Sequence, residues 1–197
     1  MRESSDFCEG HMENRLLALI AGFIAMTFVA TSYFVKKKQY YLLFQLLCIF
    51  FLITSYFFTL QFFAMVGLVV GAARTVTFYL YEKKGRVAPL GWSFLFAVLT
   101  LASYFVVNLG ILGNAQPLDL LFLVGLVSYA FIFRIRNLKI VRYAMLLPTL
   151  LSVLFNVLTD AALFAMLSYL FEFGANVVSI FKYHVFGERK KTARQNA

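Results

Sequence analysis

The feature that most constrains this chain is a succession of apolar runs, each about as long as a membrane is thick. The sequence is 62% hydrophobic and only 14% charged, whereas a soluble domain is about 45–50% apolar and about 25% charged. A helix of about 20 residues crosses the hydrocarbon core of a bilayer. The chain of 197 residues is therefore predicted to be an all-α membrane protein with seven transmembrane helices. The expected spans are residues 16–35, 40–59, 62–81, 90–109, 118–133, 140–158 and 161–183.

The basic residues indicate how these helices are oriented. A net charge of +9 could suggest nucleic-acid binding, but the Lys and Arg residues gather in four clusters between the apolar runs. The clusters lie at residues 36–38, 83–86, 134–142 and 182–194, and the alternate connections carry no Lys or Arg. By the positive-inside rule the clusters face the cytoplasm, so the N-terminus is outside and the C-terminus is cytoplasmic. No nucleic-acid partner is expected.

The sequence of the third span partly recurs in the seventh span. Residues 62–84 resemble residues 163–185, and Phe63-Ala64-Met65 recurs as Phe164-Ala165-Met166. A three-helix unit ends on the opposite side of the membrane from its start, so a parallel copy requires one additional crossing. The pattern predicts a 3+1+3 parallel repeat of three-helix units. Its parts are a disordered N-terminal tail (1–15), a first repeat (16–84), a linker helix (85–115), a second repeat (116–185) and a basic cytoplasmic tail (186–197).

A carboxylate in the seventh span is the strongest candidate for a functional residue. Glu172 lies 11 residues from the start of that span at Ala161, which is roughly 16 Å along a helix and close to the middle of a bilayer core. A charge there costs about 2.5–3.5 kcal/mol even on the insertion scale. A paired cation, a water-filled cavity or protonation of the carboxyl group could offset that cost.

Small and polar residues form matching stripes on the third and seventh spans. In the third span, Gly67, Gly71 and Arg74 share one face, which would allow close helix packing. Arg74 could pair with Glu172 or extend to the cytoplasmic headgroups. Asn176 could bind a polar substrate or join helices, and Thr75 occupies the matching position in the repeat. The predicted substrate-binding residues are Gln45, Arg74, Thr75, Asn156, Glu172 and Asn176.

No enzyme is expected, because the sequence contains no phosphate-binding glycine loop, GxSxG or HExxH motif. The two cysteines, Cys8 and Cys48, and the two histidines, His11 and His184, are isolated. We therefore expect no disulfide, no metal site and no cofactor.

Two short motifs carry a resemblance to a known family. Residues 71–75 read Gly-Ala-Ala-Arg-Thr, and residues 176–178 read Asn-Val-Val. With residues 40–84, including Gln45, these motifs resemble the YgjV-type bacterial inner-membrane protein family over most of residues 16–185. The resemblance implies a multi-pass protein of the bacterial inner membrane.

The 3+1+3 plan is also similar to that of SWEET, PQ-loop and Pnu-type transporters. In SWEET-like proteins an asparagine in the last helix of each repeat contacts the sugar. Asn176 occupies that place, but its repeat counterpart is Thr75, and no Pro-Gln dipeptide is present. The resemblance therefore implies the architecture without identifying a substrate.

Two functional hypotheses follow. The first is a facilitator that moves a small polar metabolite by alternating access at a site near the midplane. The second is a non-transporting membrane protein that binds a partner, a lipid or a receptor-type ligand. The expected partners are the lipid bilayer and a small polar solute, and a homo-oligomer is left open.

Overall fold

The fold of the described residues is entirely helical. The computed structural model describes residues 2–58, 62–111, 117–158 and 163–185. Within these ranges the α-helices are α1 Arg2–Phe34, α2 Lys38–Phe58, α3 Phe62–Lys83, α4 Leu90–Tyr104, α5 Asp119–Ile132, α6 Leu138–Leu158 and α7 Leu163–Ile180. Wider π-helical turns at Phe105–Ile111 and Phe181–Val185 continue α4 and α7. The predicted all-α class with seven helices is confirmed.

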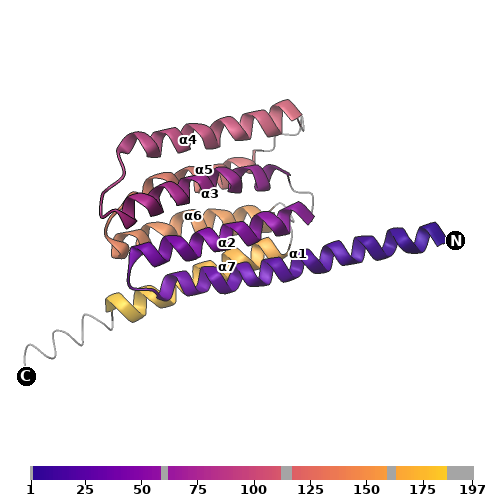
Figure 1. Cartoon of the computed structure of the whole chain (residues 1–197), viewed down its shortest axis with the longest axis horizontal. Coiled ribbons are helices and arrows are strands. Elements are labelled where there is room, and N and C mark those ends of the chain that lie inside the picture. Colours follow the sequence, from indigo (N-terminus) through magenta and orange to yellow (C-terminus); the bar gives the residue numbers. More distant parts are fainter. Residues whose placement is uncertain (1, 59–61, 112–116, 159–162, 186–197) are drawn as a thin grey trace, which may run out of the picture.

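The first helix is longer than the sequence analysis expected. It begins at Arg2, so residues 2–15 are helical where the sequence predicts a disordered tail, and in Figure 1 this part of α1 projects beyond the other helices. No proline interrupts residues 2–34, and the helical hydrogen-bond ladder can therefore continue past the apolar segment. The predicted basic tail at 186–197 and the connection at 112–116 lie outside the described residues.

Within the described ranges, four helical stretches are long and apolar enough to cross a membrane. They are Leu16–Phe34, Lys38–Phe58, Leu90–Val107 and Leu138–Leu158, while Asp119–Ile132 is apolar but shorter. Length and apolar composition therefore support several membrane crossings.

The outer surface of the bundle carries many large apolar side chains, and its interior combines an apolar core with buried polar residues. Phe23, Phe50 and Val98 are 60–65% exposed on the outside, whereas Thr75 and Asn176 are completely buried. In a soluble protein so many large apolar side chains would be unusual at the surface, because water favours polar groups there. Lipid favours an apolar exterior, and buried polar groups can then hold helices together.

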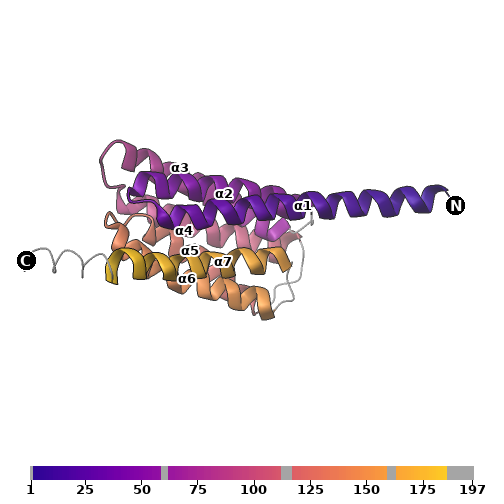
Figure 2. The same cartoon turned by 90° about the horizontal axis from the view of Figure 1, so that it is seen from below.

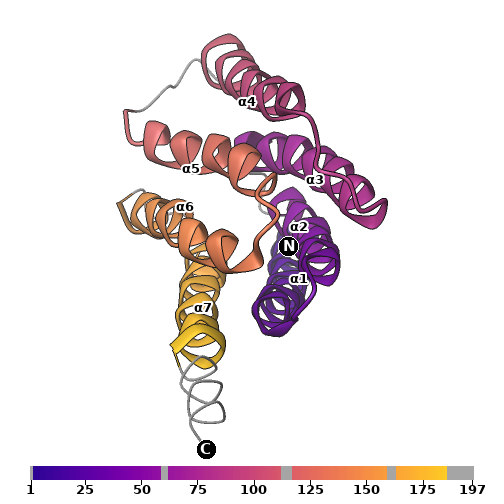
Figure 3. The ribbon, with the colours of Figure 1, turned by 90° about the vertical axis from the view of Figure 1, so that its left-hand side faces the viewer.

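The helices form a ring in chain order. Each helix packs on the next, α7 returns to α1, and α3 also contacts α5. The end-on view in Figure 3 shows α4 at the periphery, beside α3 and α5. Figure 2 shows that the helices run roughly along one common direction.

Two glycines allow close approach of α5 to its neighbours. A side-chain carbon at Gly67 would lie 3.1 Å from Leu126 Cδ1, and one at Gly125 would lie 3.3 Å from the carbonyl oxygen of Pro148 in α6. The predicted packing role of Gly67 is therefore confirmed. Pro148 lies inside the continuous helix α6 and packs against α5.

Candidate functional site

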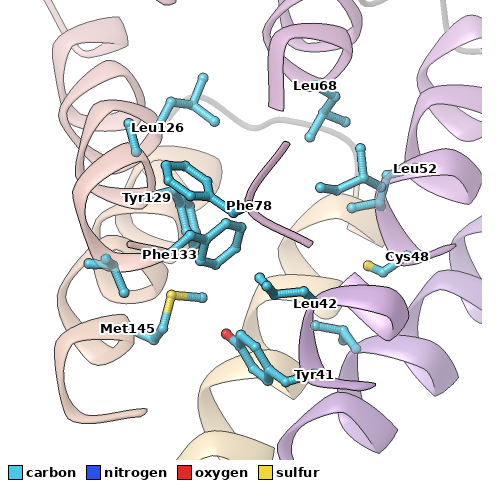
Figure 4. Close-up of a cluster of buried hydrophobic side chains, with 14 of the residues drawn as sticks. Tyr41, Leu42, Cys48, Leu52, Leu68, Phe78, Leu126, Tyr129, Phe133 and Met145 are labelled. Carbon is cyan, nitrogen blue, oxygen red and sulfur yellow. The ribbon is translucent and has the colours of Figure 1, made fainter. Parts of the chain in front are cut away.

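A small cavity lies at the centre of the bundle, between α2, α3, α5 and α7. Its volume is about 40 Å³, which is enough for water but far below the roughly 300–1,000 Å³ of typical ligand pockets. Its lining consists of Gln45, Cys48, Ile49, Leu52, Leu68, Gly71, Arg74, Leu126, Tyr129, Phe133, Tyr169 and Glu172. Figure 4 shows part of this wall, with Leu52 and Cys48 from α2 across from Leu126 and Tyr129 of α5.

Glu172 is the negative group of this cavity. It is only 5% exposed, and its Oε1 atom accepts a hydrogen bond of 2.8 Å from the hydroxyl group of Tyr33. Tyr33 belongs to α1 and is itself completely buried. The bond therefore joins α1 to α7 and partly compensates for the removal of the carboxylate from water.

Arg74 is the positive group of the same cavity. Its Nη1 atom donates a 2.7 Å hydrogen bond to the carbonyl oxygen of Leu126. Its guanidinium carbon lies 5.4 Å from the ring centroids of both Tyr129 and Phe133, which is within cation–π range. Its Nε atom is buried and has no partner.

Arg74 follows neither of the two expectations from the sequence. It is only 3% exposed and therefore does not extend to the headgroups. Among the described residues the ion pair is Lys38 with Glu82, at 2.9 Å, so Arg74 and Glu172 line one cavity without pairing. The carbonyl group of Leu126 and the rings of α5 hold the guanidinium instead.

The other predicted residues separate into two groups. Gln45 lines the cavity, and its Nε2 atom donates to Ser32 Oγ at 3.1 Å. Thr75 and Asn156 are absent from the lining and donate to carbonyl oxygens of their own helices, at 2.8 and 2.7 Å. Asn176 is also absent from the lining; its Nδ2 atom donates to the carbonyl oxygen of Arg142 at 2.8 Å. The structure therefore brings Gln45, Arg74 and Glu172 together at one cavity.

Sequence reasoning missed the residues that connect the cavity to the end of α1. From the sequence, Arg142 is only a member of the basic cluster at residues 134–142, yet it is 3% exposed and donates to the carbonyl oxygens of Tyr33 and Val35, at 3.0 and 2.8 Å. A helical spacing could have identified it, because Arg142 shares a face of α6 with the buried Met145 and Thr149. The importance of Tyr33 depends on α1 meeting α7, which no local pattern reveals.

These contacts form a closed path between three helices. Tyr33 binds Glu172 through its hydroxyl group and Arg142 through its carbonyl group. The carbonyl group of Arg142 then accepts from Asn176, one helical turn from Glu172 on α7. A displacement of α1 relative to α6 or α7 would break at least one of these bonds.

Comparison with known protein families identifies the family of this chain. A family model named Imp-YgjV, described as a bacterial inner membrane protein, matches residues 16–185. The chain belongs to the Imp-YgjV family. It is therefore a multi-pass protein of the bacterial inner membrane, as the sequence predicts, and lipid surrounds its apolar exterior. Comparisons with curated proteins and with solved structures give no match.

The polar centre of this Imp-YgjV protein carries two charges of opposite sign. In the part of the chain that the structure describes, no three His, Cys, Asp or Glu side chains gather as metal ligands would. The polar side chains that line the cavity carry a guanidinium, a carboxylate, an amide, a thiol and two phenols. Such groups can bind a polar molecule by hydrogen bonds and charge.

Proposed function

We propose that this protein is a facilitator that moves a small polar solute across the bacterial inner membrane by alternating access. The observation that carries the proposal is the central cavity, where Arg74 and Glu172 are buried without pairing with each other. Ionisable groups inside a membrane bundle are costly and most often mark a substrate or ion pathway. The resulting candidate site is the cavity between α2, α3, α5 and α7.

The size of the cavity favours alternating access over an open pore. A volume of about 40 Å³ cannot hold a metabolite, so a solute must enter after helices separate. Aromatic contacts occupy both flanks of the site. Phe122 stacks on Phe155 at 5.0 Å toward one end, and Tyr33 packs edge-on against Tyr41 at 5.6 Å toward the other. The described conformation would then be the closed form between an outward-open and an inward-open form.

The order of the helices supports a division into two units. In each half the helices pack in sequence, α1 on α2 on α3 and α5 on α6 on α7, and each half contributes two helices to the cavity. The proposal therefore includes seven membrane spans, the 3+1+3 parallel repeat, and an orientation with the N-terminus outside. The two units would move against each other around the cavity.

The native Cys48 provides a direct test, because it lines the cavity and is buried. The only other cysteine is Cys8, so Cys8→Ser leaves a single reporter thiol. A membrane-impermeant thiosulfonate would be added to right-side-out and to inside-out vesicles. We expect Cys48 to be labelled slowly from each side. The double variant Cys8→Ser/Cys48→Ser has no cysteine and gives the background labelling. Adding Leu99→Cys to that double variant places a thiol on the outer face of α4 and reports how a lipid-exposed thiol reacts.

The outcomes separate the two functional hypotheses. Labelling of Cys48 from both sides supports alternating access, because the closed cavity must open toward each side before the reagent can reach the thiol. Labelling from one side alone contradicts transport and favours a receptor-type ligand site. No labelling from either side, with the thiol still reactive after denaturation, contradicts water access and favours the non-transporting partner-binding function.

A further inference from the structure

We infer that the central cavity binds a small zwitterion, with its carboxylate on Arg74 and its ammonium group on Glu172, as an α-amino acid with a small apolar side chain would bind. This inference rests on the proposed function, because it names the solute class for the same cavity. The two opposite charges line one cavity and do not pair with each other.

The guanidinium of Arg74 is held in place but keeps hydrogen-bonding capacity. One nitrogen, Nη1, is fixed by the carbonyl group of Leu126, and the rings of Tyr129 and Phe133 flank the group. The Nε atom is buried without a partner, and Nη2 lies beside Gly71, where a side-chain carbon would come within 3.5 Å of it. The Nε and Nη2 edge of a guanidinium is the fork that binds a carboxylate through two parallel hydrogen bonds.

Glu172 presents the complementary charge on another helix of the wall. Its Oε1 atom accepts the bond from Tyr33, which positions the carboxylate on α7. A buried carboxylate gains further stabilisation from a charged donor, and a ligand ammonium group is such a donor. Gln45, also in the lining, adds an amide beside these two groups.

Charge balance decides between solute classes. Arg74 and Glu172 together have no net charge, so an anion or a cation alone would leave an excess charge in a site of low dielectric constant. A neutral polyol would leave both charges without an ionic partner. A zwitterion satisfies both and adds no net charge. The remaining wall includes Ile49, Leu52 and Leu68, which suits an apolar substituent.

The test compares three molecules that differ only in their charged groups. Alanine is the zwitterion, propionate lacks its ammonium group, and ethylamine lacks its carboxylate. The purified protein in lipid nanodiscs would be titrated with each, with glucose as a neutral control and with glycine, leucine and phenylalanine to vary the side chain. The readouts are the melting temperature and the dissociation constant. We expect at least one zwitterion to bind at least tenfold more tightly than propionate, ethylamine and glucose.

Variants then assign the two charges. Arg74→Gln and Glu172→Gln should each weaken zwitterion binding at least tenfold. Ser179→Ala is the matched control, since Ser179 is buried on the same helix as Glu172 but is absent from the lining. Gly71→Ala removes no charge but places a methyl group beside Nη2, and it should therefore weaken zwitterion binding. This variant keeps the inference testable if a charge variant fails to fold.

Each result supports or overturns the inference. Tighter binding of glucose, propionate or ethylamine than of every zwitterion overturns it, as does silence across all classes or unchanged binding in Arg74→Gln, Glu172→Gln and Gly71→Ala. The labelling of Cys48 decides the transport proposal independently. Zwitterion binding together with one-sided labelling would support the ligand class and contradict transport. Two-sided labelling without zwitterion binding would support transport and contradict the ligand class.

Discussion

At the scale of single residues, Tyr33 has two connections. Its hydroxyl group binds the carboxylate of Glu172, and its carbonyl oxygen accepts from Arg142. Its side chain is completely buried and its ring packs edge-on against Tyr41. One residue therefore links the charged centre of the bundle to the end of α1.

The hydroxyl group of Tyr33 should contribute measurably to stability. Tyr33→Phe should lower the free energy of unfolding by about 1–2 kcal/mol, because a buried carboxylate loses a donor. The same change in a Glu172→Gln background should cost less, since no charge then remains to stabilise. Unfolding in mixed micelles would measure the four proteins of this double-mutant cycle. Equal costs in both backgrounds would show that the two side chains do not interact.

At the scale of elements, the end of α1 is bound by two other helical segments. Arg142 of α6 donates to the carbonyl oxygens of Tyr33 and Val35. Tyr183, in the π-helical turns after α7, donates to the carbonyl oxygen of Phe34 at 2.7 Å, and its ring lies 4.7 Å from the guanidinium carbon of Arg142. The last carbonyl groups of a helix lack partners within it, so these side chains close the end of α1 against α6 and α7.

Breaking this closure should open the cavity on one side. The glutamine side chain of an Arg142→Gln variant is too short to reach both carbonyl groups. In a Cys8→Ser background we therefore expect several-fold faster labelling of Cys48 from the side that we propose to be cytoplasmic. Labelling from outside should not increase equally. Arg136→Gln is the control, since Arg136 belongs to the same basic cluster but is exposed. Equal labelling rates for the two variants would show that Arg142 does not keep this side of the cavity closed.

The end of α3 depends on one backbone conformation. Gly85 has φ 67°, and hydrogen bonds from the amides of Gly85 to Glu82 and of Arg86 to Tyr81 complete a Schellman cap. Gly85→Ala should destabilise by about 1 kcal/mol, because a Cβ is unfavourable in the left-handed region. Gly91→Ala in α4, which has similar free space, should be neutral or slightly stabilising. Thermal unfolding compares the two, and equal effects would contradict the cap.

At the scale of the whole molecule, the bundle is arranged for lipid. Many large apolar side chains lie on its outer surface, polar residues are buried inside it, and its charged centre lies between helices from both halves of the chain. Membership in the Imp-YgjV family places the chain in the bacterial inner membrane. Each connection between membrane spans must therefore face either the periplasm or the cytoplasm, and reporter fusions can measure which.

The proposed orientation predicts the location of two points of the chain. Alkaline phosphatase fused after residue 114 should be active, because that connection would lie in the periplasm. The same enzyme fused after residue 197 should be inactive, and a fluorescent protein fused there should fluoresce. The opposite pattern would reverse the orientation, and equal phosphatase activity at both points would contradict an odd number of crossings between them.

Much of the element structure could be predicted from sequence. The long apolar runs give the helices nearly in place, because helix formation in lipid depends on apolar length and on internal hydrogen bonding. Helical periodicity also identified the buried faces: Gly67, Gly71 and Arg74 of α3 are buried, as are Ser168 and Glu172 of α7. The exception is residues 2–15, where low apolar content predicts disorder but the helix of the structure continues.

The spacing of residues along the chain therefore predicts which side chains face the interior, whereas the packing of the helices determines which residues those side chains contact. Periodicity places a side chain on a face but contains no distance to another helix. Arg74 could thus be assigned to the interior, but its contact with Leu126 depends on how closely α3 approaches α5. Likewise Glu172 meets Tyr33 only because α7 closes the ring against α1, a contact between residues 139 positions apart.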